Sequence, residues 1–174
     1  VVARLLVGTS RSYKIISADV ERASAYQVVS PQPKGGDFSL ASTLECEPRL
    51  AAQIRWIRDM VRDRKCLIFV NTRQAAEVLG SRFRQLGEPI GVHHGSLSME
   101  ARVEAEEAFK DGKLKGLICT SSMELGIDIG DVDHVIQYSS PREVSRLLQR
   151  VGRAGHKIGL VSSGSIIATC ADDV

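Results

Sequence analysis

Short apolar runs alternate with amphipathic stretches from Glu47 onward, and this alternation restricts the fold more than any other feature of the sequence. The run CLIFVN (66–71) is apolar up to a polar turn and rich in β-branched and aromatic residues, which is typical of a strand buried on both faces. Further strand-like runs are PIGVHH, KGLICT, VDHVIQY and GSIIAT. Because the connections are long enough for crossover helices, the pattern predicts an α/β fold with an open, doubly wound parallel sheet.

The segments between these runs carry apolar residues at helical spacing. The first stripe consists of Leu50, Ile54, Ile57 and Val61. The second consists of Ala76, Leu79, Phe83 and Leu86. Thr72 is a suitable N-cap for the second helix, which the Gly-Glu-Pro sequence after Leu86 ends. We also predict a charged helix over about 98–110 and another over about 142–151.

Residues 1–45 are the least regular part of the chain. They contain the strand-like KIIS and YQVVSP, followed by the Pro-, Gly- and Ser-rich stretch PQPKGGDFSLAS. We therefore predict that 1–45 is a connector and the tail of a preceding domain. Residues 46–174 then form one globular domain, since a chain with 43% hydrophobic residues can bury a core.

Cysteine usage and hydropathy indicate the compartment. The four cysteines are scattered without a CxxC pair, which favours reduced thiols over disulfides or a metal site. No apolar stretch approaches the roughly 20 residues that a membrane span needs, so we predict no membrane partner and a cytoplasmic protein. The net charge of +2 neither requires nor excludes nucleic acid.

Small polar residues follow the predicted strands, at the sheet edge where open α/β folds bind ligands. These groups are Asn71, Thr72 and Arg73; His93, His94, Gly95 and Ser96; Thr120, Ser121 and Ser122; and Ser139, Ser140 and Pro141. Hydroxyl side chains and free N–H groups at helix starts can hold anions, so the row fits a nucleic-acid backbone. At any single position, however, a Ser or Thr can equally serve as a plain N-cap.

The segment QRVGRAGH (149–156) lies at the end of the last predicted helix and carries two arginines three residues apart. Arg150 and Arg153 therefore lie on one side of that helix. A planar, permanently charged guanidinium stabilises the negative charge that develops on a transferring phosphoryl group. The alternative is that both arginines only form surface ion pairs.

Several stretches resemble the conserved motifs of superfamily-two helicases, in order, over about 65–156. CLIFVNTR resembles motif IV, VHHGSLS the block after it, TSSMELGIDIGDVDHVI motif V, and QRVGRAGH motif VI. The stretches HHGSLS and SPREVSRLLQRVGRAGH are similar to sequences of the large helicase-related (Lhr) family of prokaryotic DNA helicases. This resemblance implies a second RecA-like domain, which closes over ATP bound to a preceding RecA-like domain and thereby moves single-stranded nucleic acid, DNA in the Lhr case.

The resemblance also implies residue roles. Nucleic-acid contacts are implied for Thr72, Arg73, Thr120 and Ser121, and we extend them to the strand-end residues Asn71, His94 and Gly95. Gly126 and Asp128 would approach the nucleotide. In motif VI, Gln149 would organise the domain contact and Arg153 would be the arginine finger, with Arg150 or His156 as helpers. His156 stands where many relatives have a second arginine, and it is charged only part of the time near neutral pH.

The chain lacks a G-x-x-x-x-G-K-[ST] phosphate loop. A RecA-like fold without this loop cannot cradle ATP and Mg²⁺ by itself, so we expect the preceding domain to hold both and the isolated chain to be inactive. Two alternatives remain open. One is a stand-alone nucleic-acid-binding module in which Arg153 has no role, and the other is a flavodoxin-like fold that binds a small phosphorylated ligand.

Overall fold

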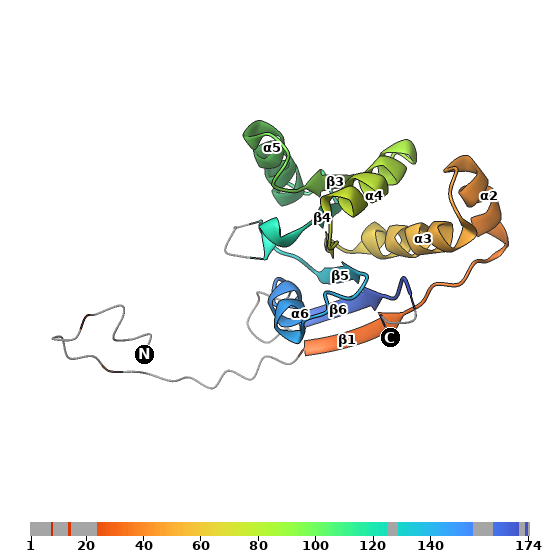
Figure 1. The fold of residues 1–174 in the computed structure, drawn as a ribbon. Helices are drawn as coiled ribbons and strands as arrows, with labels where there is room; N and C mark the ends of the chain where they lie inside the picture. The colour runs from red at the N-terminus through yellow and green to blue at the C-terminus, as the bar shows by residue number, and fades with distance from the viewer. Residues whose placement is uncertain are drawn as a thin grey trace.

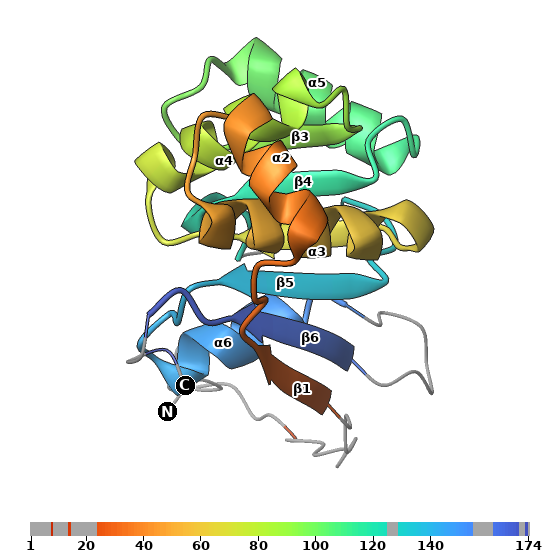
Figure 2. The ribbon, with the colours of Figure 1, turned by 90° about the vertical axis from the view of Figure 1, so that its right-hand side faces the viewer.

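The computed structural model describes residues 8, 14, 24–124, 129–154, 162–170 and 173. These residues form a six-stranded sheet in the order β1-β6-β5-β2-β4-β3, and every neighbouring pair of strands is parallel. The strands are β1 (Ser24–Val29), β2 (Cys66–Phe69), β3 (Ile90–His93), β4 (Gly116–Cys119), β5 (His134–Tyr138) and β6 (Ser162–Ile167). The predicted parallel α/β sheet is confirmed, and Figures 1 and 2 show its single twisted layer.

Helices cover both faces of the sheet, as predicted. The helices are α2 (Gly35–Thr43), α3 (Pro48–Asp63), α4 (Arg73–Gln85), α5 (Met99–Lys110) and α6 (Val144–Val151), with a 3₁₀ turn at Ser121–Met123. In Figure 2, α2, α3 and α4 lie in front of the sheet and α6 lies behind it. None of the helices among the described residues is long and apolar enough to cross a membrane.

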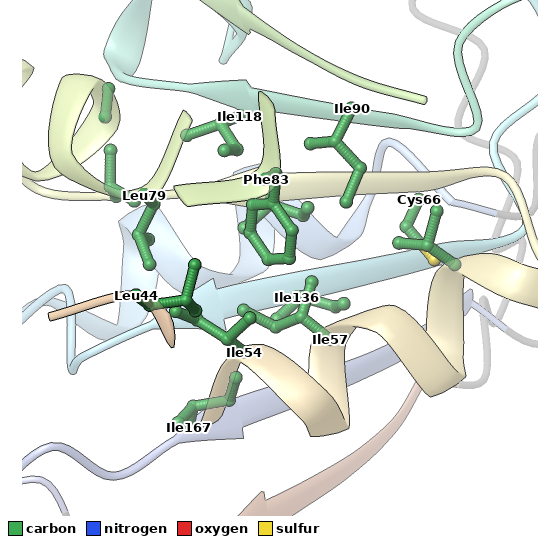
Figure 3. Close-up of a cluster of buried hydrophobic side chains, with 14 residues drawn as sticks. Leu44, Ile54, Ile57, Cys66, Leu79, Phe83, Ile90, Ile118, Ile136 and Ile167 are labelled. Carbon is green, nitrogen blue, oxygen red and sulfur yellow. The ribbon is translucent and has the colours of Figure 1, made fainter. Parts of the chain in front are cut away.

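Alternating side chains of the strands supply two cores. In β2, Ile68 points to the α3 and α4 side, whereas Leu67 and Phe69 belong to the cluster beneath α5 and α6. Figure 3 shows the first core, where Phe83 of α4 and Ile54 of α3 meet the sheet. This alternation explains why the β2 sequence is apolar throughout: both of its faces are covered.

Two cysteines lie in these cores, as the apolar runs around them predicted. Cys66 of β2 and Cys119 of β4 are fully buried. Burial raises the pKa of Cys66 to about 12 and also raises the pKa of Cys119. Both groups are therefore neutral thiols that pack as small apolar side chains.

Helix starts follow the capping residues that the sequence indicates. The Thr72 hydroxyl accepts a hydrogen bond from the Ala75 N–H (3.1 Å), and the Ser98 hydroxyl accepts one from the Ala101 N–H (3.2 Å). Each side chain satisfies an amide that has no partner within the helix. Thr72 is thus an N-cap, and it also lies at the strand end where a nucleic-acid contact is predicted.

The region predicted as a connector is structured from Ser24 onward. β1 pairs with β6 along its whole length, so the sheet extends beyond the boundary expected at residue 45. The helix α2 was not predicted, because it begins with Gly35 and Gly36, and glycine has a low helix propensity. Its start is fixed by Asp37, whose carboxylate accepts from the Lys34 N–H (2.8 Å) and from Arg55 Nε of α3 (2.7 Å). A tertiary contact therefore overrides a weak local preference.

Candidate functional site

Four of the predicted strand ends lie side by side at the carboxyl edge of the sheet. β5, β2, β4 and β3 are consecutive neighbours, so the turns that follow them form one continuous row. Asn71, Gly95 and Ser121 of these turns are exposed, and Thr120 is half-buried. The structure thus brings together the candidate contacts that the sequence placed on separate loops.

A hydrogen bond joins the turn after β2 to the turn after β3, although β4 lies between these two strands. Arg73 Nη1 donates to the Ser96 hydroxyl, which links the start of α4 to the loop after β3. Gly95 in that loop has open space where a Cβ would stand, with nothing within 4 Å. The main chain at Gly95 is therefore open to solvent.

The two adjacent histidines point to opposite faces, as expected for a strand, and both are buried. His93 Nε2 contacts Glu106 Oε1 of α5 (2.7 Å), and its Nδ1 contacts the Ser122 hydroxyl (3.0 Å). His94 Nδ1 accepts from the Ser96 N–H (3.3 Å), so Nε2 carries the proton donated to Glu77 (2.6 Å). Both nitrogens of His94 are thus engaged within the domain in this structure, and a nucleic-acid contact through His94 stays a prediction.

The loop after β5 is held in a strained conformation. Ser139 has a φ of 64° and Arg142 a φ of 63°, which are left-handed conformations that cost non-glycine residues free energy. Three side chains hold the loop: Gln137 donates to the Ser139 carbonyl (2.7 Å), Asn71 donates to the Ser140 carbonyl (2.8 Å), and Asp173 accepts from the Ser140 N–H (2.9 Å). Asn71 thus fixes the neighbouring turn, in addition to its exposed position at the edge.

The Arg150 guanidinium is buried and surrounded by acceptors within the domain. Its Nε and Nη2 donate to Glu124 Oε1 at 2.8 and 2.6 Å, and its Nη1 donates to Gln137 Oε1 (2.7 Å) and Asn71 Oδ1 (3.3 Å). The guanidinium also lies over the Phe69 ring, 5.1 Å from its centroid. Arg150 is only 1% exposed, so its ion pair with Glu124 is buried and is not the surface ion pair of the alternative.

Arg153 lies one turn further on and has a different environment. Its side chain is half-buried and donates from Nε (3.2 Å) and Nη2 (2.7 Å) to the main-chain carbonyl of Glu124. A neutral carbonyl holds this guanidinium less strongly than a carboxylate does. Gln149 is exposed on α6, which ends at Val151, before Arg153. The predicted residues Gly126, Asp128 and His156 lie outside the described residues.

Three residues of this network were missed by sequence reasoning. Glu124 binds both motif VI arginines, Gln137 is a fully buried polar residue in β5, and Asp173 anchors the β5 loop. Gln137 had a visible signal, because an amide in an otherwise apolar strand needs internal partners. For Glu124 and Asp173 the contacts span long sequence separations, and no local pattern indicates them.

The open parallel sheet with helices on both faces is the architecture of a RecA-like α/β domain. Residues 50–157 match the family described as "Helicase conserved C-terminal domain". The chain belongs to this family and is of the Lhr type.

Named relatives support this assignment. The chain is 40% identical over 181 residues to "ATP-dependent helicase Lhr-Core" of Sulfolobus acidocaldarius, covering 99% of the chain and 20% of that protein. It is 39% identical over 175 residues to the protein of the same name from Methanocaldococcus jannaschii, with the same coverage. The chain therefore spans about a fifth of the length of these relatives.

Solved structures agree with the fold. The structure of Mycobacterium smegmatis helicase Lhr bound to ssDNA and AMP-PNP superposes with a TM-score of 0.79 at 33% identity, covering 99% of this chain and 23% of that one. The C-terminal domain of the DEAD-box protein Dbp5 superposes with a TM-score of 0.61 at 20% identity, covering 87% of this chain and 80% of that one, and so supports the fold alone.

Proposed function

We propose that this domain is the second motor domain of an ATP-dependent helicase or translocase that acts on single-stranded DNA. The turns after β5, β2, β4 and β3 would contact backbone phosphates, chiefly through Thr72, Arg73, Thr120 and Ser121. A preceding RecA-like domain of the same polypeptide would hold ATP and Mg²⁺. Arg153 would reach the γ-phosphate across the domain interface, in a cytoplasmic enzyme.

One observation carries this proposal: the two motif VI arginines have different environments. Arg150 is buried and bound by a carboxylate, whereas Arg153 is half-buried and bound by one carbonyl. Only Arg153 can turn toward a phosphate without leaving a charged partner unpaired inside the domain. The relative from Mycobacterium smegmatis, solved with ssDNA and AMP-PNP, supports the choice of ligands.

The residues present fit a shared nucleotide site. The described chain offers an arginine and a row of N–H and hydroxyl donors, which suit phosphate oxygens, but its sequence has no phosphate loop. ATP bound by the preceding domain would supply the phosphoryl group. In this domain, Gln149 would contact the preceding domain and Arg153 would stabilise developing charge.

The test is ATP hydrolysis by the full-length polypeptide with and without single-stranded DNA. Arg153→Ala should lower kcat about a thousandfold while DNA binding persists, because a finger acts on phosphoryl charge and not on the strand. The matched control is Arg62→Ala, which removes an exposed arginine from the last turn of α3. Unchanged turnover in Arg153→Ala, with salt-dependent DNA binding intact, would instead indicate a binding module without an ATPase role.

A further inference from the structure

Glu124 is the residue on which both motif VI arginines converge. Its carboxylate accepts from Arg150 and its main-chain carbonyl accepts from Arg153. The Glu124 side chain is 12% exposed and that of Arg150 is 2% exposed, so water competes little for this ion pair. The residue follows the 3₁₀ turn after β4, at the same edge as Thr120 and Ser121.

The Arg150 end of this pair is fixed on every side. The Nη1 group is bonded to Gln137 of β5 and to Asn71 after β2, and the guanidinium rests on Phe69 of β2. Asn71 in turn donates to the Ser140 carbonyl. The carboxylate of Glu124 is therefore anchored to two strands in the middle of the sheet, and its backbone cannot shift without breaking charged hydrogen bonds in a buried site.

We propose that Glu124 and Arg150 are positioning residues that set the location of the Arg153 guanidinium by fixing the Glu124 carbonyl. This inference rests on the proposed function of Arg153 as the phosphate-contacting arginine. Arg150 does not contact phosphate, because its three donor nitrogens are bonded to Glu124, Gln137 and Asn71. Arg153 is bound through a carbonyl whose position the ion pair determines.

The same network links the arginine to the nucleic-acid edge. Asn71 immediately precedes Thr72, and Glu124 immediately follows the turn that begins at Ser121. A displacement of either strand end therefore alters the partners of Arg150 and, through Glu124, the position of Arg153. Hydrogen bonds thus connect Asn71, beside the proposed DNA contact Thr72, through Arg150 and Glu124 to the Arg153 guanidinium.

The experiment uses Glu124→Gln in the full-length polypeptide, compared with Arg153→Ala and with the double variant. Glutamine keeps the shape of the side chain but removes the charge that binds Arg150. Loss of positioning should lower the kcat of DNA-stimulated ATP hydrolysis about 10- to 100-fold, with little change in the KM for ATP or in DNA affinity. In single-turnover measurements, Glu124→Gln should lower the rate no further once Arg153 is alanine, because both changes act through one side chain.

The matched control is Glu104→Gln, which removes an exposed glutamate of α5. Its turnover should equal that of the wild type. A merely structural role for Glu124 would lower the rate by the same factor in both Arg153 backgrounds and would lower the DNA-binding capacity too. That result overturns the inference, as does wild-type turnover in Glu124→Gln.

A second variant covers the case in which Glu124→Gln does not fold. Glu124→Asp keeps the charge that buried Arg150 requires but shortens the side chain, so the main chain must move to preserve the ion pair. It should lower kcat only when Arg153 is present, and an equal effect without Arg153 contradicts positioning. If Arg153→Ala itself retains turnover, the proposed function fails; if only the Glu124 variants retain turnover, the positioning role fails alone.

Discussion

Replacing His134 by glutamine tests how a buried imidazole makes the stability of this domain depend on pH. His134 opens β5 and is 3% exposed. Its Nδ1 lies 2.7 Å from the Ser163 hydroxyl and its Nε2 lies 2.8 Å from the Ser165 hydroxyl, both on neighbouring β6. The ring is therefore enclosed by two hydroxyl groups and has no carboxylate partner among these contacts.

The hydrogen bonds around the ring favour its neutral form. Ser163 donates its own proton to the Asp133 carbonyl (3.2 Å), so it accepts from His134 Nδ1. Ser165 accepts from Gln27 Nε2 (2.9 Å), which leaves its proton for His134 Nε2. A second proton on the ring would force Ser165 to turn its O–H away. Burial, with a smaller contribution from nearby Arg64, lowers the pKa of His134 from 6.5 to about 4.

The size of the effect follows from the two pKa values. Because the folded pKa lies below the unfolded value of 6.5, the unfolded chain binds the proton first as the pH falls. The contribution of neutral His134 is fully present above pH 6.5 and is lost progressively toward pH 4. With about 1.4 kcal/mol per pKa unit, lowering the pH from 7.5 to 5 should cost about 2 kcal/mol of unfolding free energy.

The assay is urea denaturation of the chain at pH 7.5 and pH 5, followed by the fluorescence of Trp56, the single tryptophan, which packs against the first core. His134→Gln is less stable than the wild type at pH 7.5 but should lose about 2 kcal/mol less between the two pH values. All other titrating groups are common to both proteins and cancel in this comparison. An equal loss in the two proteins refutes the reasoning.

Three further changes have expected outcomes in the same denaturation assay. Thr72→Ala removes the cap of α4 and should cost about 1 kcal/mol, whereas Thr72→Ser, which keeps the hydroxyl, should cost much less. Gly164→Ala in β6 would place a Cβ 2.7 Å from Val151 Cγ2 of α6, and we expect a loss of about 1–3 kcal/mol from overpacking. Although burial acts in the opposite direction, hydrogen bonds from Thr169, Ser140 and Ser139 hold the pKa of Asp173 well below its ordinary value. Asp173→Asn should therefore destabilise by about 1–3 kcal/mol at pH 7.5, and wild-type stability would contradict this account of the β5 loop.

The parts of the fold that were predictable are those whose signal is local. The run CLIFVN is typical of a doubly buried strand, which the structure has at Cys66–Phe69, and Thr72 before an apolar stripe indicates the helix start observed there. β1 and α2 illustrate the opposite case. Strand pairing with β6, which follows more than 130 residues later, brings β1 into the sheet, and the ion pair between Asp37 and Arg55 stabilises a helix with two glycines at its start. Neither partner is visible from the segment itself.

The candidate site also has a part that the sequence predicts and a part that it does not. The row of strand ends was predictable because parallel strands all end at one edge, and the strand order then places β5, β2, β4 and β3 together. The contacts of His94 and Arg150 could not be predicted, because they depend on which way each side chain points, and a sequence motif does not specify this. His94 is 4% exposed and contacts Glu77, and Arg150 is 1% exposed and pairs with Glu124.

The spacing of the two arginines explains how one short helix segment serves both structure and chemistry. Residues three apart lie on one side of a helix but about one turn apart along its axis. Arg150, in the last turn of α6, packs against the sheet beside Gln137, while Arg153 lies in the turn after α6 and donates to the Glu124 backbone. A lysine at 150 could supply one charge but not three directed donor nitrogens, so the site requires arginine there for geometry. At 153 the guanidinium has one carbonyl acceptor among the described residues, which leaves its charge available to a phosphate group.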